Sequence, residues 1–580
     1  MLKKVLIANR GEIAVRVARA CQSLGVLSVA VHGLRDAGAL HVAVADEAVG
    51  LPQPGTSPPY LDPAALVDAA LVVGADAVHP GYGFLAESAA FASAVLDAGL
   101  VWVGPRPETI AALGDKEQAR RIAAEAGLPV VPGWDGPVSS ADDVIALGRS
   151  AGWPVVVKAV LGGGGRGMRV VTGEVEAEQL VAAARREASK AFGDEALLAE
   201  RFVDGARHIE VQVMADQHGS VVAVGDRECS VQRRHQKLIE EAPASSVPTG
   251  VRAAMADEAV RLLRRVGYVG AGTVEFLVVG DQHFFLEVNT RIQVEHTVTE
   301  AVTGLDLVVE QLRVASGEAL SFDRTPRPRG HAVEVRVNAE DPFRGFTPAS
   351  GRLSAFDVPS GAGLRLDSGY RQHDLVPPEF DSLLAKIVVV APDREQALRR
   401  LSRVLTATVI SGVPTTLPAA YDVVTHPDFV RGAVTTSWFE EQVEPTLRPD
   451  DPRAYRAPGD LVEVAGALIR VVRSPGGGPV RQARRAGAAS RAVDRLGTVG
   501  SPMTGAVVLL HVQVGQDVEE GDPLVTVEAM KMENVVRAEG AGVVADVAVA
   551  VGDGVRPGQP LLTLSPRQDV GEPELSPASR

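Results

Sequence analysis

Disulfide-forming cysteine, long apolar runs and excess positive charge are all missing from this 580-residue chain. Because Cys21 and Cys229 are its only cysteines, a disulfide framework and a four-thiolate zinc site are excluded, and a reducing cytoplasm is the expected setting. No apolar run approaches the roughly 18 residues that span a bilayer, and Arg10 interrupts the first apolar stretch too early for a signal peptide. The net charge of -15 argues against general nucleic-acid binding. We therefore expect neither a membrane nor a nucleic acid as a partner.

Lysine is the other scarce residue, since 50 of the 58 basic residues are arginine and only eight are lysine. A lysine kept in such a chain can provide a compact point charge or an amine that can be acylated, which a guanidinium cannot. Lys3, Lys4 and Lys190 are interpreted as residues without a special role. The remaining lysines, which are candidates for chemistry, are Lys116, Lys158, Lys237, Lys386 and Lys531.

The length predicts about three or four folding units, because single hydrophobic cores stop growing beyond roughly 250 to 300 residues. The expected fold class is multidomain, α/β and α+β. Strand and helix patterns alternate from the first residues, which predicts a doubly wound, Rossmann-like unit over 1–113 and a second α/β unit over 114–325. A mixed unit of strands and helices is expected over 330–445.

The composition changes after residue 445. Residues 446–498 are expected to form a linker, because 470–495 hold seven arginines and a single acid, together with the run SPGGGP. The polar, proline-containing residues 566–580 are expected to be disordered. The linker is therefore expected to tether a mobile domain over 499–565.

An internal repeat lies within that last domain. Residues 505–528 match residues 542–565 without gaps at a period of 37. Short strands with Gly and Pro turns in two copies predict two similar sheets, packed as a pseudo-symmetric β-sandwich. The connection between the copies contains EAMKMEN, which displays Lys531 at one end of the domain. The ordinary alternative is a solvated hairpin lysine, but the methionines on both sides of Lys531 are unusual for a solvated turn.

A glycine-rich stretch at 162–167 formally satisfies the pattern G-x-G-x-x-G, which indicates a dinucleotide site only where a helix follows. Here PVVVKA precedes the glycines and MRVV follows them, so both flanks are expected to be strands and the glycines the tip of a hairpin. The Walker pattern is absent. Such a loop can fold its backbone N–H groups over phosphates, and Lys158 adds a cation.

Two acids are expected to face each other on a hairpin within residues 273–296. A three-residue turn at 280–282 would pair Val279 with His283 and therefore Glu275 with Glu287. Two carboxylates that face each other destabilise a hairpin, so we expect a cation to bind beside Glu275 and Glu287. The residues that share the face if the strand stays extended are Glu287, Asn289, Arg291, Gln293 and Glu295. Two acids and an amide predict a Mg2+ or Mn2+ site completed by nucleotide phosphates, with a solvated strand face as the alternative.

Taken in order, these stretches resemble one family. The motifs are KVLIANRGEIAVR, HPGYGFLAE, GDK, GGGGRGM, RHIEVQV, RECSVQRRHQK and HAVEVRVNAEDP, and with them residues 1 to about 445 resemble biotin carboxylase. AMKM at 529–532, inside the repeat, resembles the attachment motif of biotinyl domains, whereas lipoyl domains lack the methionine pair. The combination resembles the α subunit of acyl-CoA carboxylases of the acetyl- or propionyl-CoA type. It implies an ATP-grasp domain with a mobile lid over about 130–204.

The resemblance also implies roles for individual residues. Those expected to bind ATP are Lys116, Lys158, Gly164, Gly165, Glu200, Arg201, Phe202, Val203, His208, His235, Glu275 and Glu287. The metal ligands would be Glu275, Glu287 and Asn289, and the bicarbonate site Lys237, Arg291, Gln293 and Val294. The biotin pocket would hold Tyr82, Gly83 and Arg336, and the biotinylated residue would be Lys531. The catalytic set would be Arg291, Glu295, Lys237 and Arg336, with Glu295 as the base that deprotonates bicarbonate.

The implied reaction is the carboxylation of biotin on Lys531 by ATP and bicarbonate, through carboxyphosphate. No carboxyltransferase domain fits between the carboxylase region and the repeat, because domains have about 50 to 250 residues. A separate carboxyltransferase β subunit is therefore expected, together with a biotin protein ligase and a homo-oligomer of the carboxylase part within a larger hetero-oligomer.

Acetyl-CoA, which implies fatty acid biosynthesis, and propionyl-CoA are the leading acceptors, with methylcrotonyl-CoA, pyruvate or urea as alternatives. Two other classes of protein stay open: a different ATP-grasp ligase and a noncatalytic carrier with a degenerate front half. The AMKM repeat argues against the first, and the full set of acids, lysines and arginines argues against the second.

Overall fold

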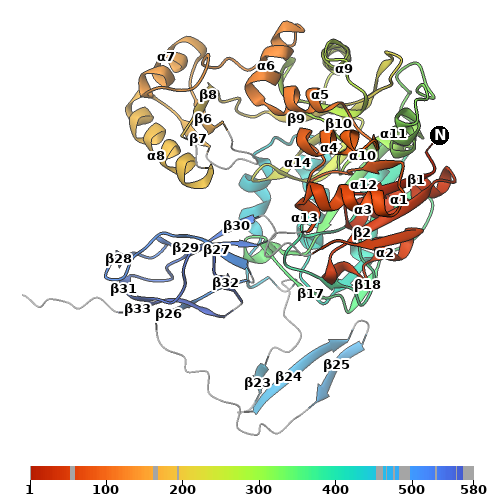
Figure 1. Ribbon diagram of the computed structural model, residues 1–580. Helices are drawn as coiled ribbons and strands as arrows, with labels where there is room; N and C mark the ends of the chain where they lie inside the picture. The colour runs from red at the N-terminus through yellow and green to blue at the C-terminus, as the bar shows by residue number, and fades with distance from the viewer. Residues whose placement is uncertain are drawn as a thin grey trace, which may run out of the picture.

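The computed structural model describes most of the chain, and Figure 1 shows how its parts are arranged. The described residues are 2–52, 59–160, 168–192, 195–451, 453, 461–464, 467–474, 477–482, 497–503, 505–529, 532–556 and 558–565. Gly164, Gly165 and Lys531, which carry predictions, lie outside the described residues, as do residues 566–580. In the ranges given above, no helix is long and apolar enough to cross a membrane.

The N-terminal region builds a parallel sheet with the strand order β3-β2-β1-β4-β5. Its strands are β1 (Lys4–Ile7), β2 (Leu27–His32), β3 (Glu47–Gly50), β4 (Ala77–His79) and β5 (Val101–Trp102). Its helices are α1 (Gly11–Ser23), α2 (Leu40–Val44), α3 (Pro63–Val72), α4 (Ala89–Asp97) and α5 (Pro107–Gly114). Val5 and Ile7 pack into one core and Leu6 into another, because both faces of the sheet are covered. The predicted doubly wound unit is confirmed.

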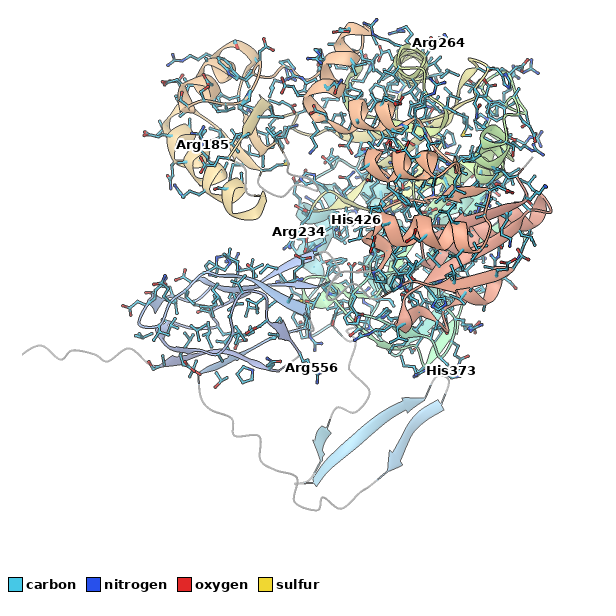
Figure 2. The ribbon with its side chains drawn as sticks, in the orientation of Figure 1. Arg185, Arg234, Arg264, His373, His426 and Arg556 are labelled. Carbon is cyan, nitrogen blue, oxygen red and sulfur yellow. The ribbon has the colours of Figure 1, made fainter. Side chains whose placement is uncertain are left out.

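The predicted lid forms a lobe of its own (Figure 1). Strand β6 (Val155–Ala159) pairs antiparallel with β7 (Arg169–Val171) and with β8 (Leu197–Arg201), so strands do flank the glycine-rich stretch as expected. Helices α7 (Ala141–Ala151) and α8 (Glu174–Phe192) pack on this sheet around a separate apolar core. Arg185 of α8, labelled in Figure 2, donates from Nη2 to the carbonyl oxygens of Val138 and Ser139, at 2.9 and 3.0 Å.

An eight-stranded sheet forms the centre of the molecule, in the order β13-β12-β9-β10-β11-β14-β21-β19. Its strands are β9 (Arg207–Ala215), β10 (Val221–Arg233), β11 (Gln236–Ala242), β12 (Gly270–Val279), β13 (Gln282–Asn289), β14 (His331–Asn338), β19 (Leu364–Ser368) and β21 (Leu383–Ala391). The sheet runs across the boundary expected at 325–330, because β11 pairs with β14. The second and third predicted units therefore share one sheet.

Helices cover this sheet and connect it to its surroundings. They are α6 (Lys116–Glu125), α9 (Thr249–Arg265), α10 (His296–Thr303), α11 (Leu307–Ala315), α12 (Arg394–Ala407), α13 (Leu417–Thr425) and α14 (Pro427–Val430). Short strands beyond the sheet are β15 (Glu340–Asp341), β16 (Thr347–Pro348), β17 (Gly351–Arg352), β18 (Ala355–Asp357), β20 (Leu375–Val376) and β22 (Val409–Ser411). The mixed unit of strands and helices expected over 330–445 is present, with β14 near its start and α12 within it.

The hairpin of β12 and β13 differs from the prediction in its turn. Val279 pairs with Gln282, so the turn has two residues and not three, and Gly280 takes the positive φ of +58° that favours glycine at the first position of a tight hairpin. A β-bulge then compensates: Phe276 pairs with Phe285, but Glu275 pairs with Glu287. The predicted turn was wrong, and the predicted pair of opposed acids is nevertheless present.

The C-terminal domain is a sandwich of two four-stranded sheets, ordered β26-β33-β31-β28 and β30-β29-β27-β32. The strands are β26 (Thr498–Gly500), β27 (Gly505–Leu510), β28 (Asp517–Val518), β29 (Pro523–Ala529), β30 (Met532–Arg537), β31 (Gly542–Val547), β32 (Gly554–Val555) and β33 (Pro560–Ser565). Strands one repeat apart, such as β27 and β31, begin 37 residues apart and lie in opposite sheets. The predicted pseudo-symmetric sandwich is confirmed.

Part of the segment predicted as a linker has regular structure. Three strands, β23 (Leu461–Val464), β24 (Ala467–Ser474) and β25 (Gly477–Gln482), form an antiparallel sheet in chain order. Its pairs are consecutive in sequence, and β24 carries two of the seven arginines, Arg470 and Arg473, with Arg470 opposite Gln482. The basic composition predicted a flexible connection and missed this sheet.

Candidate active site

A cavity of about 390 Å³ collects most of the residues that the sequence singles out. The predicted residues that line it are Tyr82, Gly83, His208, His235, Lys237, Glu275, Glu287, Asn289, Arg291, Gln293, Val294, Glu295 and Arg336. A larger cavity of about 460 Å³ beside α12 and α13 holds none of them. Because titratable groups of both signs converge in the smaller cavity, we take it as the candidate active site.

Lys237, at the start of β11, is surrounded by carboxylates. Its Nζ lies 2.6 Å from Glu210 Oε2, 2.8 Å from Glu275 Oε1 and 2.7 Å from Glu295 Oε1. Burial alone would lower the pKa of Lys237, but these three carboxylates raise it well above its usual value. Lys237 is therefore a fixed cation in the floor of the cavity.

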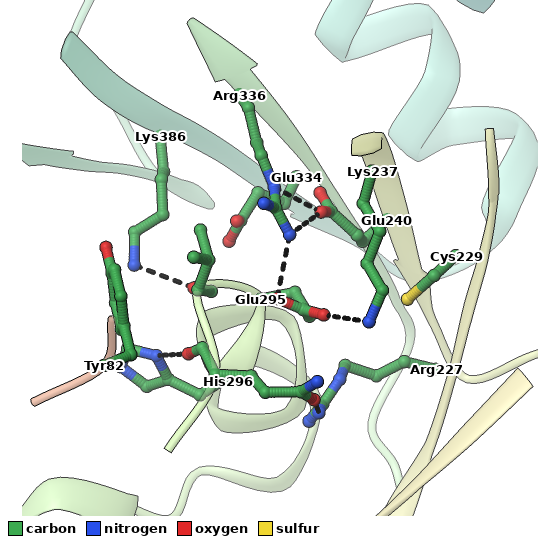
Figure 3. Close-up of polar contacts among 12 residues, drawn as sticks. Tyr82, Arg227, Cys229, Lys237, Glu240, Glu295, His296, Glu334, Arg336 and Lys386 are labelled. Atoms are coloured by element: carbon green, nitrogen blue, oxygen red, sulfur yellow. Dashed lines mark hydrogen bonds and ion pairs between the residues drawn. The ribbon is translucent and has the colours of Figure 1, made fainter. Parts of the chain in front are cut away.

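Glu295 lies between two cations (Figure 3). Besides Lys237, its Oε2 accepts from Arg336 Nη2 at 2.9 Å, and Arg336 also reaches Glu240 Oε1 at 2.5 Å. Burial would raise the pKa of Glu295, but Lys237, Arg336 and Arg227 together hold it well below its usual range. The carboxylate is thus ionised and weakly basic while both cations contact it.

Two other buried acids, Glu340 in the cavity wall and Glu240 beside Arg336, have raised pKa values, which gives a prediction for stability. Burial, the first cause, raises the pKa of Glu240 and that of Glu340 to about 7. The folded chain keeps these protons where the unfolded chain releases them, so stability should fall as the pH rises from 4.5 to about 7. Glu240→Gln removes one of the groups, and its melting temperature should vary less with pH in this window than that of the wild type. Parallel melting curves of the two proteins would contradict the assignment.

The opposed acids of the hairpin form a hard oxygen cluster. Asn289 Nδ2 donates to Glu275 Oε1 at 2.9 Å, Gln293 Nε2 donates to the same oxygen at 2.8 Å, and His208 Nε2 lies 3.0 Å from Glu275 Oε2. Burial and, next, the charge of Glu275 raise the pKa of Glu287. A divalent cation would relieve this repulsion, and carboxylate and amide oxygens are the ligands that Mg2+ prefers. The donor set therefore fits the predicted metal site.

The residues predicted for ATP divide between the cavity and the lid. Outside the cavity lining are Lys116, Lys158, Glu200, Arg201, Phe202 and Val203. Lys158 on β6 donates from Nζ to Glu200 Oε2 on β8 at 2.6 Å. Burial lowers the pKa of Lys116 while Glu287 acts to raise it, and the charges of Lys158 and Glu200 also reach Lys116. Lys116 is thus close enough to both the lid pair and Glu287 for their charges to act on it.

Arg201, Phe202 and Val203 take part in packing at the base of the lid. The Arg201 guanidinium lies 5.7 Å from the ring centroid of Phe284, and the Phe202 N–H donates to the carbonyl of Pro154 at 2.8 Å. Val203 is buried in a small apolar cluster. His235, in contrast, lies in the turn between β10 and β11 with φ of +63° and lines the cavity.

Strand β13 ends at Asn289, so the condition that it stays extended through Glu295 is not met. Thr290 and Arg291 turn away because Glu87 accepts from the Thr290 N–H at 3.2 Å and from Arg291 Nε at 2.9 Å. Glu295 directly precedes α10. The loop after β13 nevertheless brings Arg291 and Glu295 into the lining of the cavity.

Sequence reasoning missed several charged residues that hold the site together. Arg227 is fully buried and donates to Glu210, to Gln212 Oε1 at 2.8 Å and to Gln293 Oε1 at 2.7 Å. Glu87 forms an ion pair with Arg291, and Glu240 forms one with Arg336. A signal for Glu210 was present in RHIEVQV, where polar residues alternate with apolar ones as on a strand with a polar inner face.

Four family models match the chain in order. They are biotin carboxylase, N-terminal domain, over 1–110; carbamoyl-phosphate synthase L chain, ATP binding domain, over 115–322; biotin carboxylase C-terminal domain, over 334–441; and biotin-requiring enzyme, over 497–564. Together they account for both the carboxylase region and the C-terminal sandwich.

Known proteins agree with these models. The chain is 44% identical over 576 residues to the biotin-dependent acyl-coenzyme A carboxylase alpha3 subunit of Mycobacterium leprae, covering 94% of this chain and 96% of that protein. It is 46% identical to a biotin carboxylase of Nostoc sp., covering 76% of this chain and 98% of that protein. Among solved structures, the biotin carboxylase domain dimer of Hydrogenobacter thermophilus 2-oxoglutarate carboxylase, in complex with MgADP, ADP and bicarbonate, matches with a TM-score of 0.73 at 42% identity. That match covers 76% of this chain and 98% of the other.

The four domains and the charged cavity define an ATP-dependent ligase of the biotin carboxylase class. The chain belongs to the biotin-dependent carboxylase family, among the α subunits that join a biotin carboxylase to a biotinyl domain. Its cofactors are biotin and ATP.

Proposed function

We propose that this chain carboxylates biotin held on Lys531, using ATP and bicarbonate, and that a separate carboxyltransferase subunit then uses the carboxyl group to carboxylate an acyl-CoA. The observation that carries the proposal is the convergence of Lys237, Arg336 and Glu295 beside the hairpin acids in one cavity. Cations that can hold anionic substrates stand there within reach of a carboxylate that can take a proton.

Bicarbonate would bind to Lys237, Arg291, Gln293 and the backbone of Val294. The two cations that contact Glu295 are also those proposed to meet anionic substrates. An anion that draws Lys237 or Arg336 toward itself removes the contacts that hold the pKa of Glu295 low. Substrate binding therefore raises the basicity of Glu295 at the moment when it takes the proton of bicarbonate.

ATP would lie between the lid and the hairpin. Lys116, Lys158 and the backbone of Gly164 and Gly165 would hold its phosphates, and residues 200–203, His208 and His235 would surround the adenosine. Glu275, Glu287 and Asn289 would ligate Mg2+, which supplies charge stabilisation for phosphoryl transfer. The side chains of this cluster orient the ions and the phosphate toward bicarbonate, and carboxyphosphate would be formed there.

Biotin would enter beside Tyr82, Gly83 and Arg336, which line the cavity. The guanidinium of Arg336 is held by Glu240 and Glu295, so its position is fixed. A fixed cation at this place can steady the carboxyphosphate and the negative charge that develops on the biotin ring. Tethering through residues 446–498 raises the local concentration of biotin at the cavity.

Relatives support the choice of acceptor. One is the acyl-coenzyme A carboxylase subunit of Mycobacterium leprae, and another, 36% identical, is the propionyl-CoA carboxylase alpha chain of Ruegeria pomeroyi. Acetyl-CoA, with a role in fatty acid biosynthesis, and propionyl-CoA are therefore our first candidates. Pyruvate stays an alternative because a relative from Methanothermobacter thermautotrophicus is a pyruvate carboxylase subunit. A biotin protein ligase and a homo-oligomer of the carboxylase part complete the proposal.

The test is ATP hydrolysis by the purified chain. Hydrolysis should require bicarbonate and increase when free biotin is added, because both substrates are consumed in one cavity. Omission of bicarbonate is the matched control. A rate of hydrolysis that changes with neither addition would contradict the carboxylase activity and support a noncatalytic carrier. If the enzyme is active, a panel of acyl-CoA substrates, assayed with the copurified partner subunit, identifies the acceptor.

A further inference from the structure

Lys386 is the one candidate lysine to which the proposed function gives no role. It lies on β21 and its side chain is fully buried. Across the sheet its register partners are Arg336 on β14 and Asp367 on β19. Lys386 is therefore a direct strand neighbour of the arginine proposed to meet biotin.

The ammonium of Lys386 joins two distant parts of the chain. Nζ donates to the backbone carbonyl of Val294 at 2.8 Å and lies 3.0 Å from Glu12 Oε1 in the first turn of α1. The same Glu12 oxygen accepts from the hydroxyl of Tyr82. One buried ion pair thus touches the loop proposed for bicarbonate and the tyrosine proposed for biotin.

Lys386 and Arg336 hold consecutive residues of the same loop. Figure 3 shows both side chains reaching from neighbouring strands toward the segment that carries Glu295. Arg336 contacts the carboxylate of Glu295, and Lys386 contacts the carbonyl of Val294. Because a peptide unit is planar, fixing the Val294 carbonyl fixes the plane that leads into Glu295. The orientation of the Glu295 carboxylate, the proposed base, thus depends on Lys386 as well as on Arg336.

The surroundings explain why a lysine stands here. Burial would lower the pKa of Lys386, but Glu12, Glu334 and Asp367 raise it, while Arg365 acts in the opposite direction. A compact ammonium can serve a carbonyl and a carboxylate at once in such a space. An arginine would place five N–H donors beside two acceptors, the Val294 carbonyl and the Glu12 carboxylate, so some of its donors would lack a partner among these contacts.

We propose that Lys386 is a positioning residue that couples the bicarbonate subsite to the biotin subsite, by holding the Val294 carbonyl and the Glu12 carboxylate with one ammonium group. The proposal rests on the proposed function, since it concerns how that cavity is kept in order. Lys386 itself contacts no substrate in this scheme.

The main test is the double variant Lys386→Met with Glu12→Gln, which removes the ammonium together with the carboxylate that contacts it. The KM values for bicarbonate and for free biotin should both rise by about tenfold or more, as expected for loss of charge-assisted hydrogen bonds, while the KM for ATP should change by less than about twofold. Added biotin should also stimulate ATP hydrolysis less than in the wild type. A uniform loss of rate with unchanged KM values would overturn the proposal.

The single variant Glu12→Gln separates the two ends of the connection. It keeps the contact between Lys386 and Val294, so the KM for biotin should rise while the KM for bicarbonate stays at the wild-type value. This variant also keeps the proposal falsifiable if the double variant does not fold. A rise in neither constant would count against the role of Glu12 and Tyr82.

A matched control is available on the far end of β11. Arg394 and Glu241 form a partly buried ion pair with Nε and Oε2 at 2.7 Å, and neither lines the cavity. Arg394→Met with Glu241→Gln should lower stability and leave all KM values unchanged. If the wild type shows no bicarbonate-dependent hydrolysis, the proposed function fails; if the wild type is active and the Lys386 variants keep wild-type constants, only this inference fails.

Discussion

Glu295→Gln should reduce bicarbonate-dependent ATP hydrolysis by about 100-fold or more, because an amide cannot accept the proton of bicarbonate. The fold should survive the change. Lys237 keeps its contacts with Glu210 and Glu275, and Arg336 keeps Glu240, so no buried cation is left without a carboxylate. The measurement is the steady-state rate with and without bicarbonate, beside calorimetric binding of ATP, which should stay within about twofold of the wild type.

Glu295→Asp serves as the conservative control for this variant. It keeps the carboxylate and withdraws it from the cations, so partial activity should return at high bicarbonate concentration. Retention of more than about a tenth of the wild-type rate by Glu295→Gln would remove Glu295 from the role of base, because general-base catalysis contributes more than that.

Lys531→Arg should abolish biotin attachment and all transfer of carboxyl groups from the chain, because ligation requires a nucleophilic amine and arginine stays protonated. Hydrolysis of ATP with free biotin should remain at the wild-type rate, since the cavity is unchanged. Intact-protein mass spectrometry after expression with biotin measures the first effect, and the assay with free biotin measures the second.

Lys190→Arg is the matched control for Lys531→Arg, since the sequence gives Lys190 no role. It should keep the biotin-sized mass increment and full transfer. If the biotin-sized mass increment persists in Lys531→Arg and disappears in another lysine variant, biotin is attached to that other lysine. The proposal that the chain carboxylates biotin would be unaffected.

Local patterns were predictable from the sequence, and long-range pairings were not. The repeat at a period of 37 identified the sandwich, because each copy repeats the same strands and turns. The scarcity of lysine marked Lys386, but nothing local pointed to Glu12 or Val294 as its partners. These contacts depend on how β21, α1 and the loop before α10 pack together, and the residue pattern of one strand does not predict that packing.

The boundary expected at 325–330 shows a similar limit of sequence patterns. Proline and charge marked a break in the chain correctly, but the strands on its two sides, β11 and β14, pair in one sheet. The composition of a segment indicates where the chain forms an exposed connection, but it does not indicate which strands pair on the two sides of that connection. The same limit hid Arg227, whose partners come from several elements.

The bulge beside Glu275 and the two-residue turn at Gly280 constrain how this hairpin can be varied. Each shifts the strand register by one residue, and their effects cancel at the acids. A residue inserted at the tip would break the opposition of Glu275 and Glu287 unless the extra residue of the bulge, Leu286, were removed at the same time. Length changes among natural relatives should therefore occur in compensated pairs here, and grafting a longer tip onto this hairpin would require deleting the bulge.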